Sequence, residues 1–93
     1  MGTYLVERFL AGEAAEQLAR IADASREACR QLGADGVEVR YLGSTLVPKD
    51  ESCFCLFEAA SRADVERANR SGGLGYLRIS EAVASGEWVG TAT

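Results

Sequence analysis

The chain has 93 residues, the length of one domain, and its formal net charge is −4 at pH 7. It therefore lacks the basic surface that replaces counterions along nucleic acid, and we expect no nucleic-acid partner. It contains no histidine, which excludes Ser-His-Asp and Cys-His catalytic sets. No apolar run is long enough to span a membrane and residues 1–10 lack a signal-peptide pattern, so we expect a cytoplasmic protein.

The N-terminal third of the chain predicts a strand followed by a long helix. Residues 3–9 are rich in β-favouring side chains and form a short first strand. Residues 13–32 carry apolar side chains at spacings of three and four residues, the pattern of an amphipathic helix. Acidic Glu13 and Glu16 fall in its first turn, where they favour the helix dipole, and Gly33 is expected to end it.

The middle of the chain predicts a β-hairpin. Residues 37–47 alternate in the manner of a strand, and Gly43 within them indicates a β-bulge. A turn over residues 48–51 begins with proline. Residues 52–59 then form the most strand-like segment of the sequence.

The C-terminal third predicts a second helix and a last strand. Ser61, with Asp64 three residues later, is a variant of the capping box that begins a helix. This helix is expected to end near Ser71, before the glycine pair at 72–73, and a last strand follows over residues 78–84. The glycine-rich stretch follows a helix, so it is not a phosphate-binding loop.

This element order predicts an α+β fold, a ferredoxin-like β-α-β-β-α-β sandwich with a four-stranded antiparallel sheet. Right-handed crossovers place the first and third strands at the centre and both helices on one face. We expect a single domain over residues 1–85, followed by a C-terminal tail over residues 86–93. The other sheet face needs a cover, and a second copy of the chain is the simplest one, which predicts a homodimer.

Two segments carry a resemblance to a known family. YLVERFL at residues 4–10 and YLGSTLVPKDESCFCLFEA at residues 41–59 resemble a family of small actinobacterial proteins catalogued as a domain of unknown function. That family includes a dimeric nickel-binding protein with a ferredoxin-like fold. The resemblance covers roughly residues 3–83 and implies the same fold, a dimer and a divalent metal such as nickel as cofactor. No ligand set carries over, because this chain lacks histidine, the commonest protein ligand of such metals.

The element order alone is also similar to that of the dimeric α+β barrel enzymes. Some of these enzymes cyclise or oxidise polyketides without a cofactor. This similarity implies a cofactor-independent cyclase or isomerase of secondary metabolism as an alternative function.

Two glutamates fall among apolar neighbours on the strands expected at the centre of the sheet. We expect these strands to be parallel neighbours, with Glu7 and Glu58 both near their C-terminal ends, so that the two carboxylates meet if they fall on the same side. Such a pair would raise one pKa, recruit a cation or need an arginine, and Arg40 and Arg78 on the edge strands are the candidates. As catalytic residues, Glu7 or Glu58 would be the acid or base, and Arg40 would stabilise developing negative charge. The structural alternative is an ion-pair network between subunits.

The chain has three cysteines, an odd number that excludes a complete disulfide framework. Cys53 and Cys55 point to one face of the third strand, about 7 Å apart, so we expect reduced thiols. Together they supply half of a metal site, to which Cys29 could add a ligand from the first helix. The alternative is that these cysteines are small apolar fillers of the core.

Aromatic and basic residues on the strands are the remaining ligand-binding candidates. Tyr4, Tyr41 and Tyr76 would line a pocket, with Arg8 and Arg78 as its charged members. Core packing within the sheet is the alternative for the aromatic residues. The sequence thus favours a dimer that binds a small molecule or metal ion on the open sheet face. A purely structural or interaction module is the third possibility.

Overall fold

The computed structural model describes residues 1–11 and 14–83; Glu13 and the predicted tail over 86–93 lie outside the described residues. In chain order its elements are β1 (Gly2–Phe9), α1 (Ala14–Ala34), β2 (Val39–Val47), the 3-10 turn η1 (Pro48–Asp50), β3 (Ser52–Ala59), α2 (Arg62–Ser71) and β4 (Arg78–Ala82). The helices and strands follow the β-α-β-β-α-β order predicted from the sequence, with β2 and β4 each two residues shorter than expected.

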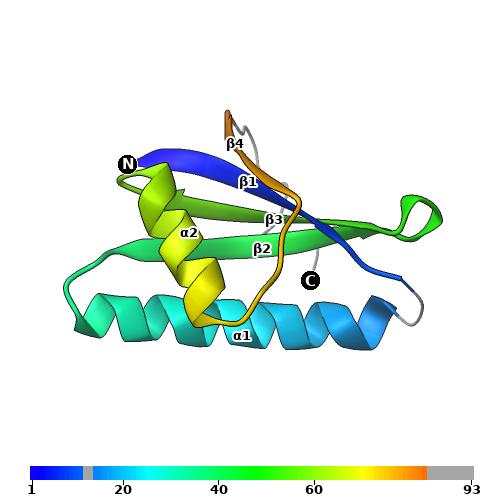
Figure 1. Ribbon diagram of the computed structural model, residues 1–93, viewed down its shortest axis with the longest axis horizontal. Coiled ribbons are helices and arrows are strands. Elements are labelled where there is room, and N and C mark those ends of the chain that lie inside the picture. The colour runs from blue at the N-terminus through cyan, green and yellow to red at the C-terminus, as the bar shows by residue number, and fades with distance from the viewer. Residues whose placement is uncertain (12–13, 84–93) are drawn as a thin grey trace.

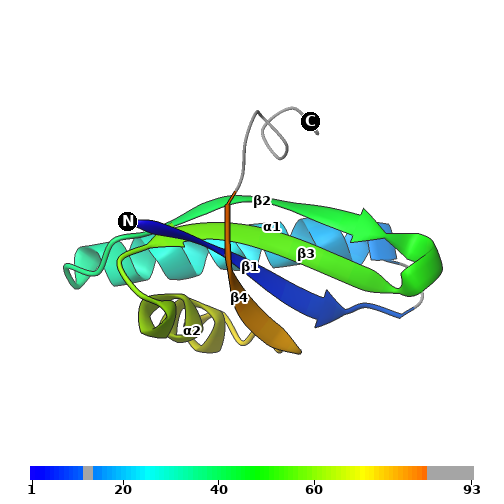
Figure 2. The same ribbon diagram turned by 90° about the horizontal axis from the view of Figure 1, so that it is seen from above.

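The four strands form one sheet in the order β2-β3-β1-β4, with β1 and β3 at the centre as predicted. Both helices cover one side of this sheet (Figure 1). Seen from above, α1 runs beneath the hairpin strands and α2 lies beside it (Figure 2). Within the described ranges, no helix is both long and apolar enough to cross a membrane.

The two central strands run antiparallel, so the expectation that they are parallel neighbours is wrong. The reason lies in the connections. The crossover through α1 brings β2 back parallel to β1, and the tight hairpin at η1 then reverses the chain into β3. A residue near the end of β1 therefore faces the beginning of β3.

The first helix ends later than predicted. Gly33 lies inside α1, and the left-handed conformation falls on Gly36, which has a φ of 85°. The Gly36 N–H donates to the Gly33 carbonyl at 3.0 Å, and the Val37 N–H donates to the Leu32 carbonyl at 2.9 Å. These bonds satisfy the last carbonyls of the helix, so Gly36 and not Gly33 supplies its C-terminal turn.

Other local signals are confirmed. The Ser61 hydroxyl accepts a hydrogen bond from the Asp64 N–H at 3.3 Å and caps α2. The register of the hairpin shifts between Tyr41 and Gly43, which is the predicted bulge. Both signals depend on residues close in sequence, which is why they are readable without the fold.

The core lies between the sheet and the two helices. Alternation along β1 turns Val6 to this side, and β3 contributes Phe57 together with two buried cysteines. Ile21 of α1 and Val65 of α2 pack against them. The opposite side of the sheet, which we call the open face, carries Thr3, Leu5 and Glu7 from β1 and Phe54, Leu56 and Glu58 from β3.

Candidate functional site

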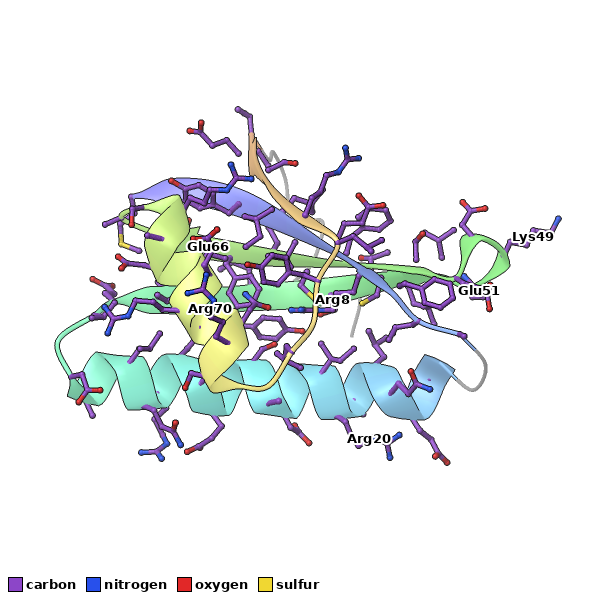
Figure 3. All side chains as sticks on the ribbon, viewed as in Figure 1. Arg8, Arg20, Lys49, Glu51, Glu66 and Arg70 are labelled. Atoms are coloured by element: carbon purple, nitrogen blue, oxygen red, sulfur yellow. The ribbon has the colours of Figure 1, made fainter. Side chains whose placement is uncertain are left out.

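A buried arginine lies at the centre of the most polar part of the interior. Strand alternation turns Arg8 to the helix-covered side of β1, where the residue is only 3% exposed. The other arginines of the chain are exposed. Figure 3 shows Arg8 in the layer between the sheet and α1. A guanidinium in this position is costly unless its charge and its N–H groups are compensated.

Arg8 is held by hydrogen bonds to neutral groups. Its Nη2 donates to Oδ1 of Asn69 at 2.6 Å, and its Nη1 donates to the Gly75 carbonyl at 3.1 Å. Asn69 is itself buried and oriented by a hydrogen bond from its Nδ2 to the Val65 carbonyl at 2.8 Å. The Nε of Arg8 is buried without a hydrogen-bond partner. The ion pairs found in the described part of the chain use other arginines.

Two thiols lie next to this guanidinium. Cys53 is the cross-strand partner of Arg8, and both Cys53 and Cys55 are fully buried. Their sulfurs are 3.9 Å apart, closer than the spacing of alternate residues suggests, because the side chains lean together. Sγ of Cys55 also lies 2.9 Å from Oγ of Ser44, which hydrogen-bonds the Tyr41 hydroxyl. All three thiols are free.

The two thiols of the pair differ in acidity. The pKa of Cys55 is lowered, first because the Cys53 thiol donates a hydrogen bond to it, and further by the positive charge of Arg8 and a hydrogen bond that the Ser44 hydroxyl donates. The pKa of Cys53 is raised by the same hydrogen bond and by burial. Cys55 is therefore the thiol that ionises first, beside the positive charge of Arg8 that favours its ionised form.

The thiol pair does not fit a nickel site. Among residues 1–11 and 14–83, no group of three or more His, Cys, Asp or Glu side chains is placed to hold a metal ion. The pair supplies two sulfurs, and the neighbouring Arg8 charge repels a cation. Cys29, on α1, is half-buried and adds no third sulfur to such a group. Two sulfurs alone leave a four-coordinate metal without half of its ligands.

A cavity of about 510 Å³ opens beside Arg8, between the first half of α1 and the segment that leads into β4. We call it the Arg8 cavity. It is lined by Arg8, Phe9, Leu10, Gln17, Arg20, Ile21, Ala24 and residues 73–77. Arg20 is exposed at its rim, on the side of α1 away from the sheet in Figure 3. No acidic residue is among the described residues that line the cavity.

The two glutamates share the open face but do not meet. Glu7 lies opposite Phe54, whereas Glu58 lies opposite Thr3, so the two are four residues apart along the antiparallel strands. That separation is about 13 Å, far beyond contact. The expected pair of carboxylates is therefore wrong in its geometry, because it rested on parallel strands.

Each glutamate instead has its own arginine. Nε of Arg78 lies 2.9 Å from Oε1 of Glu7, and Nη1 of Arg40 lies 3.0 Å from Oε1 of Glu58. Both pairs connect an edge strand to a central strand across the open face. Arg40 is thus the partner of Glu58 alone, and the two ion pairs are separate from one another on the open face.

Of the ligand-binding candidates, Arg8 and Tyr76 line the cavity. Tyr4 belongs to the core, and Tyr41 packs on Phe57 with a ring-centroid distance of 5.4 Å. Arg78 lies on the opposite side of the sheet. The structure therefore separates residues that the sequence analysis grouped as one pocket.

Asn69 is the residue that the sequence analysis missed. It follows Val65 and Ala68 on the buried side of α2, and the three are the buried residues of that helix. A polar side chain on the apolar side of a helix needs a buried hydrogen-bond partner. The position of Asn69 on that side was the sequence signal that could have identified it. With Arg8 it makes a buried polar centre beside the cavity. The described lining offers no carboxylate to act as a general acid or base.

Both the sequence and the fold of this chain match those of known proteins. Residues 4–82 match the family described as nickel responsive protein SCO4226-like. Among solved structures, SCO4226 from Streptomyces coelicolor A3(2) superposes with a TM-score of 0.75 at 19% sequence identity. The match covers 90% of this chain and 99% of that chain, and at this identity it supports the fold. No curated protein matches the chain. The family match confirms the resemblance carried by segments 4–10 and 41–59.

Proposed function

The chain belongs to the SCO4226-like family of nickel-responsive proteins, and on this basis we propose that it is a homodimer that binds nickel on the open face of its sheet. The observation that carries the proposal is the composition of this face. It has an apolar centre and two carboxylates, and both α1 and α2 lie on the other side of the sheet.

The apolar centre supports the dimer. Leu5 and Phe54 are half-buried and Phe9 at the end of β1 is 59% exposed, whereas Leu56 between them is already buried within one chain. A second copy related by a two-fold axis would present the same strip and remove it from water. The Arg78–Glu7 and Arg40–Glu58 pairs flank the strip, where charged groups define the rim of an interface.

Subunit pairing also supports metal binding at this face. A two-fold interface brings the same face of both subunits together, so that Glu7 and Glu58 from each chain reach a common surface. Donors from two chains can then complete a coordination shell. Nickel has to compete with Arg78 and Arg40 for these carboxylates. We therefore expect a lower nickel affinity than a cluster of carboxylates without arginine partners would have.

The test is a nickel titration of the purified chain by calorimetry, with variants that preserve side-chain shape. We expect saturable nickel binding that Glu7→Gln or Glu58→Gln weakens at least about tenfold, or roughly 1.4 kcal/mol, because each change removes a carboxylate ligand. Cys53→Ser with Cys55→Ser is the matched control and should leave nickel affinity unchanged. Binding that survives both glutamate changes but is lost with the two cysteines would reject the open-face site.

A further inference from the structure

The Arg8 cavity is lined by a buried guanidinium that has no carboxylate partner in the described part of the chain; the ionisable groups packed beside it are the Cys53 and Cys55 thiols. Arg8 is only 3% exposed to solvent, and it lines the cavity. Its Nε has no hydrogen-bond partner, while Asn69 and Gly75 occupy one N–H of each terminal nitrogen. Of the five N–H donors of a guanidinium, these bonds use two.

The rest of the cavity wall is mostly apolar. Its apolar members are Phe9, Leu10, Ile21, Ala24, Leu74, Tyr76 and Leu77. Gln17 and Arg20 are the polar side chains on α1 that border it. A chain with 14 acidic and 10 basic residues thus places two arginines, and no acid among the described lining residues, around its cavity. The cavity thus has the buried charge of Arg8 beside an apolar wall and the charge of Arg20 at its rim.

We propose that the Arg8 cavity binds a small organic acid, whose carboxylate pairs with Arg8 and whose hydrocarbon body packs on the apolar wall. A planar guanidinium matches the geometry of a carboxylate, and its burial strengthens the attraction. A cavity of about 510 Å³ is within the size range of small-molecule sites. Arg8 faces the helix-covered side of the sheet, so this site is separate from the open face and goes beyond the proposed function.

The first test compares an acid with its neutral analogue. Octanoate and octanamide have the same hydrocarbon body, whereas acetate has the charge without it. Calorimetry should show saturable octanoate binding at least about tenfold tighter than that of either control. Backbone amide NMR shifts should be concentrated at residues 17–24 and 73–77. Equal affinity for octanoate and octanamide, or shifts concentrated on the open face, would overturn the proposal.

Variants then assign the binding to the cavity. Arg8→Met should lose the preference for octanoate over octanamide, whereas Arg70→Met, at an exposed arginine of α2 outside the cavity, should keep it. Arg8 also holds Asn69 and Gly75, so Ala24→Leu is a second variant that fills the cavity without touching these bonds. Octanoate affinity should fall at least about tenfold in Ala24→Leu, with the circular-dichroism spectrum unchanged. Unchanged octanoate binding in folded Ala24→Leu would contradict the proposal.

Discussion

At the scale of single residues, Arg8 shows what strand alternation can predict and what it cannot. The period of two places Arg8 on the same side of β1 as Tyr4 and Val6, which the sequence already shows. The sequence does not reveal that this side is covered by α1 and α2, nor that Asn69 meets Arg8 there. Those facts depend on contacts between residues 61 positions apart in the chain.

Glu7 and Glu58 also show that strand alternation predicts the face of a residue but not its neighbours. Alternation correctly assigns Glu7 and Glu58 to one face, but their distance depends on strand direction and register. A crossover followed by a hairpin requires β1 and β3 to be antiparallel, so the element order already contained this answer. The pairing of Glu7 with Arg78 was then a matter of register, which alternation alone does not determine.

The thiol pair gives a prediction about pH at this scale. The lowered pKa of Cys55 means that the folded protein releases this proton at a lower pH than the unfolded chain, whose cysteines titrate near about 8.5. The unfolded state binds more protons between these two values, so the free energy of unfolding should rise with pH across that window. Below the window, this contribution is lost.

The measurement is urea unfolding at several pH values from about 6 to 8.5. Cys55→Ser should remove most of the rise in unfolding free energy. Cys29→Ser is the matched control, because burial raises the pKa of Cys29 and that thiol stays protonated over the range. A rise of the same size in Cys55→Ser and in the unmodified chain would show that Cys55 does not ionise in the folded state.

At the scale of elements, local signals predict a helix cap and a β-bulge better than the end of the long helix. The cap at Ser61 and the bulge at Gly43 were readable because each depends on neighbouring residues. The end of α1 was not, since Gly33 and Gly36 can both terminate a helix. The choice is made by the bond from the Val37 N–H to the Leu32 carbonyl, which joins the helix end to the strand that follows.

These two glycines give a matched pair of substitutions. Gly36→Ala should lower the free energy of unfolding by about 1 kcal/mol, because its φ of 85° is unfavourable for a residue with a Cβ atom. Gly33→Ala should raise it by about 0.5–1 kcal/mol, because Gly33 is helical and an added Cβ meets no atom within 4 Å. Urea unfolding measures both, and effects of the same sign would contradict the assigned helix end.

At the scale of the whole molecule, the sheet separates two candidate sites. The open face carries the carboxylates and the apolar strip, while the Arg8 cavity lies on the helix-covered side. The general architecture was predictable, because element order and crossover handedness leave few alternatives. The cavity was not, since it arises where the segment before β4 passes over α1, a contact that no local pattern encodes.

The central claim is that the open face is the surface on which two copies of this chain meet. Light scattering on the purified chain at micromolar concentration tests it most directly, with Phe54→Lys as the variant and Lys49→Glu, on the exposed hairpin turn, as its control. We predict about twice the mass of one chain for the unmodified protein and the control, and the mass of one folded chain for Phe54→Lys, because a charge in the apolar strip opposes its burial. A monomeric unmodified chain, or a Phe54→Lys variant that remains dimeric, would contradict the claim.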